Sequence, residues 1–327
     1  MRFDQALLQL PIRFCADTLA AEVQALPPEA WVPHPQGFPG NEAVPLVSQG
    51  GQLNNSVAGP MAPTDQLRRC PYIMEIMAEL GGVWGRSRLM GLGPGADVPP
   101  HVDINYYWRT HLRIHIPVIT NPNVTFTCGN DSVHMAAGEC WVFDSFLLHN
   151  VRNRGGAQRV HLVLDTVGGE RLWDLIETAP ASQPPAAASM LQPGERQGQN
   201  LEFEQINVPK VMSPWEIQCH IAYLAERTMP DPMVKPVMKR LDKFTTAWAA
   251  AWARFGTSDE GLETYRQLIA TTRDDLYAME AEDLVLSNGR ALFFFLDALL
   301  FANAVAQDKT RKLIEATAEY GEQRLAS

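Results

Sequence analysis

The sequence predicts an α+β protein whose β-rich centre forms a sandwich or a jelly roll and whose C-terminal region is helical. Between residues 82 and 166, short segments rich in Val, Ile, Thr and aromatic residues alternate with Gly, Pro and Asn turns. This pattern is typical of many short strands. A segment rich in Pro, Ala, Gln and Gly follows, and beyond residue 200 apolar residues recur with helical spacing.

The first 80 residues are expected to mix helical and extended pieces. Amphipathic patterning predicts a helix over residues 16–26, which two prolines end, and another over 66–80, which Pro71 breaks early. The stretch between them, residues 27–63, is rich in Pro and Gly. It is therefore expected to be irregular.

Six strands are predicted in the central region because each segment is bounded by turn residues. They cover residues 88–92, 111–118, 124–127, 140–144, 150–153 and 159–166.

The C-terminal part is predicted to form four helices, the first beginning with Pro214 at its first helical position. These helices cover residues 214–227, 232–255, 260–281 and 289–324. We expect three divisions: a jelly-roll domain with an N-terminal extension, a linker, and a helical domain, over residues 1–178, 179–200 and 201–327. The helical domain covers the active site or forms a homodimer interface, and the sequence leaves both open.

Composition excludes several classes of protein. The 327 residues carry a formal net charge of −10, which argues against nucleic-acid binding. The most apolar stretch, residues 291–306, is too short to span a bilayer, so no membrane association is expected. Five cysteines without a CxxC pair indicate neither a zinc ribbon nor a disulfide framework. With no signal-peptide pattern at the start, a cytoplasmic protein is expected.

Three side chains form a candidate metal site. His101 and Asp103 are two residues apart in a segment that its prolines keep from being helical, so both side chains point to one side. Such a pair alone is a weak signal. His149, close to another predicted strand, supplies a second imidazole. Two His and one carboxylate form the facial triad that suits non-haem Fe(II) and leaves coordination positions open.

Two predicted strands carry an unusual polar face. On one, Arg159, His161 and Asp165 alternate with aliphatic residues, and on the other Arg113 and His115 do the same. A solvated face usually carries Lys and Glu, and neither strand has any. We therefore favour a polar interior cavity, in which guanidinium groups can bind a dicarboxylate through paired hydrogen bonds.

In this order and spacing, these residues resemble the aspartyl/asparaginyl β-hydroxylase family of Fe(II)- and 2-oxoglutarate-dependent oxygenases, which includes bacterial L-proline cis-4-hydroxylases. The similarity covers residues 82–166. Four segments carry it in the family's order: residues 95–103, 112–117, 138–143 and 159–165. The resemblance implies a double-stranded β-helix, the jelly roll of that family.

The resemblance also implies the roles of the site residues. His101, Asp103 and His149 would bind Fe(II), and Arg159 would pair with the distal carboxylate of 2-oxoglutarate. Arg113 and His115 would lie near the metal-bound end of this co-substrate, and O2 would be the second co-substrate.

Two positions depart from the aspartyl enzymes of that family. Those enzymes have Gly at the position of Asp103, whereas here the triad is complete, as in the proline hydroxylases. Where they place an Arg that meets the substrate carboxylate, this chain has His111. Both departures argue against an aspartyl substrate.

The expected substrate is a free amino acid or a peptide residue of the Asp/Asn or Pro type. Candidate substrate contacts are His111, Asn105, Tyr107, Trp108 and Trp84. The aromatic run after Asp103 forms either a pocket rim or a hydrophobic clamp over the barrel mouth. Two other functions stay open: a cupin-like metal enzyme that does not use 2-oxoglutarate, and a non-catalytic sensor of 2-oxoglutarate or metal.

Overall fold

The computed structural model describes residues 5–34, 37–179, 185 and 188–306. Contacts between Cα atoms divide the chain into two units. The first unit runs to Asp103 and resumes from Thr110 to Asn207. The second unit contains Ile104–Arg109 and the chain from Val208 on.

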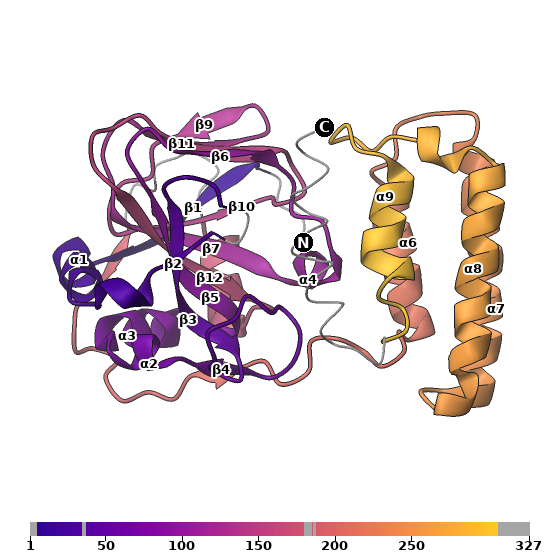
Figure 1. Cartoon of the computed structure of the whole chain (residues 1–327), viewed down its shortest axis with the longest axis horizontal. Helices are drawn as coiled ribbons and strands as arrows, with labels where there is room; N and C mark the ends of the chain where they lie inside the picture. Colours follow the sequence, from indigo (N-terminus) through magenta and orange to yellow (C-terminus); the bar gives the residue numbers. More distant parts are fainter. Residues whose placement is uncertain (1–4, 35–36, 180–184, 186–187, 307–327) are drawn as a thin grey trace. The chain divides into compact units, whose positions relative to one another are not determined.

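The first unit contains a large and a small β-sheet (Figure 1). The strands of the large sheet are β1 (Leu7–Phe14), β2 (Val32–Pro33), β3 (Asn41–Gln49), β4 (Met61–Pro63), β5 (Val83–Leu92), β7 (Leu112–Ile119), β10 (Glu139–Phe143), β12 (Arg159–Thr166), β13 (Ser189–Leu191) and β14 (Glu202–Phe203). The strands of the small sheet are β6 (Asp97–His101), β8 (Val124–Cys128), β9 (Asp131–Val133) and β11 (His149–Asn153). The large sheet has the order β13-β1-β10-β7-β12-β5-β3-β2, with β14 beside β5 and β4 beside β3, and the small sheet has the order β6-β11-β8-β9.

The path of the chain between these sheets defines a jelly roll. From β5 to β12 the chain alternates between them: β5, β7, β10 and β12 lie in the large sheet, and β6, β8, β9 and β11 in the small one. Neighbouring strands among these eight pair antiparallel wherever they are joined. This is the winding of a double-stranded β-helix, so the predicted α+β class with a jelly-roll core is confirmed.

The large sheet has two faces of different character because side chains alternate along its strands. The outer face belongs to the main hydrophobic core, to which β12 contributes Val160, Leu162 and Leu164. Helices of the first unit supply the other side of this core. They are α1 (Ala16–Gln24), α2 (Asp65–Arg68), α3 (Pro71–Leu80) and α5 (Glu170–Glu177). Figure 1 shows α1, α2 and α3 beside the large sheet.

The inner face of the large sheet packs partly against the small sheet. Leu92 and Trp141 from the large sheet form one apolar cluster with Phe126 and Val151 from the small sheet. The polar residues of β7 and β12 share this inner face. Arg113, His115, Arg159, His161 and Asp165 are all buried, which confirms the prediction of a polar interior.

Three predictions for the first unit were wrong. Residues 27–63 are not irregular, since β3 lies at their centre, with Pro45 at a bulge in its pairing with β5. Strand β6 was missed because it contains two prolines, which the edge of the small sheet tolerates. Inside the predicted linker, β13 pairs parallel to β1.

The second unit is helical and contains α4 (Tyr106–Thr110) together with the C-terminal helices. These are α6 (Pro214–Ala225), α7 (Val234–Phe255), α8 (Leu262–Ala278) and α9 (Leu292–Leu296). Trp248 of α7 lies at the centre of its core, with ring centroids 5.4 Å from Phe244 and 4.5 Å from Tyr265 of α8.

The last predicted helix is shorter than expected. After α9 the chain forms one π-helical turn, η4 (Asp297–Phe301), and then leaves the helix, so a continuous helix over residues 289–324 was wrong. The end of that prediction, from residue 307, lies outside the described residues. Within the described part of the chain, no helix is both long and apolar enough to cross a membrane.

Candidate active site

The structure brings His101, Asp103 and His149 together. One ligand atom from each of these residues lies within 4.8 Å of the other two, which leaves room for a single ion. Strand pairing explains the approach of the histidines, because His149 on β11 pairs directly with His101 on β6, and their ring centroids lie 4.2 Å apart. Asp103 follows β6, and its backbone N–H donates to the carbonyl oxygen of Ser145 at 3.1 Å.

Both imidazoles are oriented for metal binding by backbone carbonyls. The Nδ1 atom of His101 lies 2.9 Å from the carbonyl oxygen of Pro99, and Nδ1 of His149 lies 2.9 Å from that of Leu147. A carbonyl oxygen only accepts, so each Nδ1 carries the proton and each Nε2 presents a lone pair. Nε2 of His149 is buried and has no hydrogen-bond partner among the described residues. Burial and the nearby His101 lower the pKa of His149 to about 3, so this ring is neutral at pH 7.

Asp103 is held as a carboxylate by surrounding positive charge. Burial alone would raise its pKa, but Arg113, with help from His149 and His101, keeps the pKa below its ordinary value. The Nη1 atom of Arg113 lies 3.3 Å from Oδ2 of Asp103. His149 Nε2 lies 3.9 Å from the same oxygen. The triad therefore offers two imidazole nitrogens and one carboxylate oxygen.

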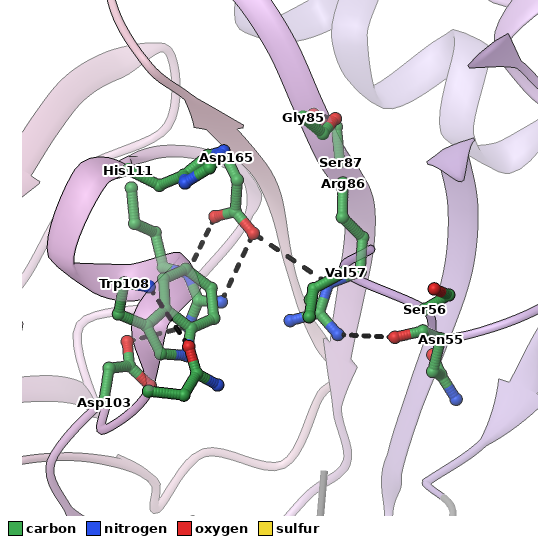
Figure 2. Close-up of polar contacts among 12 residues, drawn as sticks. Asn55, Ser56, Val57, Gly85, Arg86, Ser87, Asp103, Trp108, His111 and Asp165 are labelled. Atoms are coloured by element: carbon green, nitrogen blue, oxygen red, sulfur yellow. Dashed lines mark hydrogen bonds and ion pairs between the residues drawn. The ribbon is translucent and has the colours of Figure 1, made fainter. Parts of the chain in front are cut away.

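Arg113 belongs to a buried group of charged side chains. Besides Asp103 it contacts Asp165 on β12, with Nε 3.0 Å from Oδ1 and Nη2 3.5 Å from Oδ2. Arg86 on β5 lies 3.9 Å from the second oxygen of Asp165, and its Nη1 donates to the carbonyl oxygen of Asn55 at 3.0 Å (Figure 2). Two carboxylates thus balance two guanidinium groups. Arg86 was not predicted from the sequence, although it alternates with small and apolar residues along β5.

Arg159, in contrast, has no counterion among the described residues. It begins β12 on the inner face, is 3% exposed, and burial lowers its pKa to about 9, so it remains cationic at neutral pH. Its Nε and Nη2 atoms are buried and find no hydrogen-bond partner in the described chain. A buried cation of this kind is costly unless an anion pairs with it.

His115 and His161 form a buried pair next to Arg159. Their Nδ1 atoms lie 3.4 Å apart, and the Nε2 atom of each ring is buried without a partner among the described residues. Burial, followed by the charge of Arg159, lowers the pKa of each ring well below its ordinary range. Both rings are therefore neutral.

The five candidate substrate contacts lie in three different environments. Trp84 is fully buried in the main hydrophobic core. His111 uses both ring nitrogens: Nε2 lies 2.7 Å from Oε1 of Glu204, and Nδ1 lies 3.2 Å from the hydroxyl of Thr110. Asn105, Tyr107 and Trp108 belong to the second unit. Within it, the side chain of Asn105 accepts a hydrogen bond from the Trp108 backbone at 3.1 Å.

A cavity of about 80 Å³ opens in the first unit beside β3 and β5. Arg88, Asn54 and Asn55 are among the polar groups that line it, together with the apolar side chains of Pro45 and Met90. In the sheet register Arg88 pairs with Val163, which pairs in turn with His115. Arg88 therefore shares the inner face with the polar residues of β7 and β12.

The residues present fit an Fe(II) ion and a 2-oxoglutarate anion. Two imidazole nitrogens and one carboxylate are the donor set of non-haem Fe(II) sites. The unpartnered nitrogens of Arg159, His115 and His149 are buried positions where an anion and a metal would supply the missing partners. Arg113 contacts the candidate metal ligand Asp103, and its guanidinium also holds the carboxylate of Asp165. Its expected place near the metal-bound end of 2-oxoglutarate stays a prediction.

Comparison with known proteins supports the resemblance inferred from the sequence. Residues 43–168 match the model of the family described as aspartyl/asparaginyl β-hydroxylase. The match begins earlier than the similarity expected from residue 82 and includes β3. Among curated proteins, L-proline cis-3-hydroxylase 1 from a Streptomyces species is 29% identical over 137 residues, which cover 37% of this chain and 45% of the relative. The chain thus matches less than half of that relative's length.

Solved structures give weaker likenesses. A 2OG-Fe(II) oxygenase family oxidoreductase from Burkholderia pseudomallei aligns with a TM-score of 0.38 and 14% identity, over 51% of this chain and 88% of that one. A prolyl-4-hydroxylase from Pseudomonas putida aligns with a TM-score of 0.35 and 16% identity, over 50% of this chain and 93% of that one.

Proposed function

We propose that this chain, whose residues 43–168 match the aspartyl/asparaginyl β-hydroxylases, is an Fe(II)- and 2-oxoglutarate-dependent dioxygenase. It would hydroxylate a C–H bond of an amino acid or of a peptide residue and convert 2-oxoglutarate to succinate. One observation carries the proposal: a facial triad shares its barrel with Arg159, a buried guanidinium whose Nε and Nη2 have no partner in the described chain. A metal site alone would not require this cation.

Each residue of the site has a defined task in this proposal. His101, Asp103 and His149 would hold the iron, which supplies the oxidising chemistry with O2 and 2-oxoglutarate. Arg159 would pair with the distal carboxylate of 2-oxoglutarate and so fix the direction from which it reaches the metal. Arg113 would keep Asp103 ionised and in place. Phe143, whose ring centroid lies 4.7 Å from that of His149, would fix the imidazole and keep water away from its buried side.

The cavity beside β5 supports a small substrate that carries a carboxylate. Arg88 is a cation at its wall, and Asn54 and Asn55 add amide groups next to apolar surface. This combination suits a free amino acid with an apolar side chain. The similarity to an L-proline cis-3-hydroxylase favours proline or a related amino acid as the first candidate.

The test uses purified protein loaded with Fe(II) without oxygen. Addition of 2-oxoglutarate should produce a weak visible charge-transfer band, and admission of O2 should then release succinate faster with the right amino acid than without it. A panel of free amino acids and short peptides, followed by mass analysis for one added oxygen, identifies the substrate. Arg159→Ala should raise the 2-oxoglutarate requirement by a factor of about 100 while iron still binds, because a charge-assisted pair is lost.

The two other functions give different results in the same experiment. A well-folded, iron-loaded protein without the band would favour a cupin-like enzyme that does not use 2-oxoglutarate. A band without substrate-stimulated succinate release over the whole panel would favour a sensor. Unchanged 2-oxoglutarate affinity in Arg159→Ala would contradict the role of Arg159. The cytoplasmic location and the homodimer expected from the sequence stay predictions, and light scattering tests the dimer.

A further inference from the structure

The proposed function leaves His161 without a task, although its environment is unusual. It lies on β12 two residues after Arg159, is 1% exposed, and faces the barrel interior. Its ring meets that of His115 edge to face, with centroids 5.7 Å apart and the two Nδ1 atoms 3.4 Å apart. Sequence analysis placed His161 on the polar face but gave it no role.

Two neutral imidazoles that meet through Nδ1 can be arranged in only two ways. One Nδ1 must carry the proton and donate, while the other must present a lone pair and accept. If His115 donates, its Nε2 atom has a lone pair. If His161 donates, Nε2 of His115 carries a proton and becomes a donor. The hydrogen bond between the rings thus decides what His115 presents at its buried and unpartnered Nε2.

We propose that His161 is a positioning residue that donates its Nδ1 proton to His115, so that Nε2–H of His115 becomes a hydrogen-bond donor to the anionic co-substrate. This inference rests on the proposed function, because it takes a 2-oxoglutarate carboxylate as the acceptor.

The charges around the pair favour this arrangement. Arg159 and His161 are two residues apart on the inner face of β12, and His161 meets His115, so a carboxylate that pairs with Arg159 would lie near both rings. A lone pair on Nε2 of His115 would repel that carboxylate, whereas an N–H would bind it. Burial and the charge of Arg159 lower the pKa of both rings and so disfavour a second proton on either. A fixed tautomer presents a donor there without adding a charge.

The experiment measures the tautomer and the co-substrate affinity separately. Protein with ¹⁵N-labelled histidine rings is loaded with diamagnetic Zn(II) and titrated with 2-oxoglutarate, by NMR for the ring nitrogens and by calorimetry for the dissociation constant. In the wild type, Nε2 of His115 should be protonated in the complex. In His161→Leu, His115 should no longer be restricted to the tautomer with Nε2–H. Binding of 2-oxoglutarate should weaken about three- to tenfold, which corresponds to the loss of one net hydrogen bond.

Two further variants separate positioning from packing. In His161→Asn the side-chain amide nitrogen takes the place of Nδ1 and can donate to His115, so the tautomer and most of the affinity should return. Val163→Ala removes buried volume from the same face of β12 and should leave the tautomer unchanged.

A wild-type complex whose His115 carries its proton on Nδ1 would overturn the inference, even if His161→Leu failed to fold. So would a folded His161→Leu with unchanged tautomer and affinity. Zn(II)-loaded wild type that binds no 2-oxoglutarate would instead refute the proposed function, and this inference with it.

Discussion

Neutralising Asp165 should weaken both the barrel and its metal site. Asp165 is 1% exposed and is the counterion of Arg113 and Arg86, at 3.0 Å and 3.9 Å. Asp165→Asn keeps the shape of the side chain and one acceptor oxygen. It leaves the buried group of Arg86, Arg113 and Asp103 with one excess positive charge. Loss of one partner of a buried ion pair lowers the unfolding free energy by about 3–5 kcal/mol. The amide oxygen of Asn still accepts a hydrogen bond, so we expect a loss near the lower value.

The metal site should weaken for a related reason. In the wild type Asp165 neutralises Arg113, so the charge of Asp103 remains available to a metal ion. In Asp165→Asn the whole charge of Arg113 acts on Asp103 and competes with the metal. Loss of such an outer partner typically lowers metal affinity by a factor of about 10–100.

Two measurements check these values. Hydrogen exchange followed by mass spectrometry reports the opening free energy of β7 and β12 in the metal-free protein, and Zn(II) calorimetry reports metal affinity. Asp97→Asn is the matched control, since it removes the same charge from an exposed ion pair with Arg154 and should change little. Opening free energies within about 1 kcal/mol of the wild type, together with unchanged Zn(II) affinity, would refute this account of Asp165.

Three further predictions concern other groups. Asp103→Ala should abolish most metal binding in Zn(II) calorimetry and most turnover, and full activity would show that two histidines suffice. Burial and the charge of Arg109 lower the pKa of His220 from 6.5 to about 4, so unfolded His220 takes up its proton at higher pH than the folded form. Acidification from pH 7 to pH 4.5 should therefore lower the unfolding free energy of the wild type by about 2–3 kcal/mol more than that of His220→Leu in urea titrations, and equal losses would contradict it. Iodoacetamide should alkylate Cys15 before Cys140 in peptide mass spectra, because the Thr18 hydroxyl lowers the pKa of Cys15 and burial raises that of Cys140; equal rates would count against this.

The sequence predicted the parts of the fold that local patterns determine. The alternation along β7 and β12 identified both strands and the face that their polar residues share. Prediction from local patterns failed where strand pairing in the sheets overrides the conformational preference of a residue. Pro45 is accommodated by a bulge in β3, and the prolines of β6 by an edge position, and neither is visible before the strand order is known.

The residues of the candidate site also fall into those that local patterns predicted and those that they did not. His101 and Asp103 were found because two residues of an extended segment point to one side, and His149 because a second imidazole close to another predicted strand completes a facial triad. Trp84 was misjudged, since aromatic character does not distinguish a pocket wall from the core in which it lies. Arg86 was missed because the predicted strand began at residue 88, whereas β5 begins at Val83.

Arg113 and Arg159 show why a residue's type and face do not determine its task. Both are arginines on the inner face of the large sheet, and the sequence assigned both to 2-oxoglutarate. The register between β7 and β12 places Arg113 directly opposite Asp165, so that its charge is satisfied within the protein. Arg159 pairs in register with Leu92 on β5, and Nε and Nη2 of its guanidinium have no partner in the described chain. Two arginines that the sequence could not distinguish thus differ in electrostatic state, and only the second has unsatisfied charge to offer an anionic ligand. Sheet register, which sequence periodicity leaves undetermined, therefore separates the arginine that holds the proposed iron ligand Asp103 from the arginine that would bind the co-substrate.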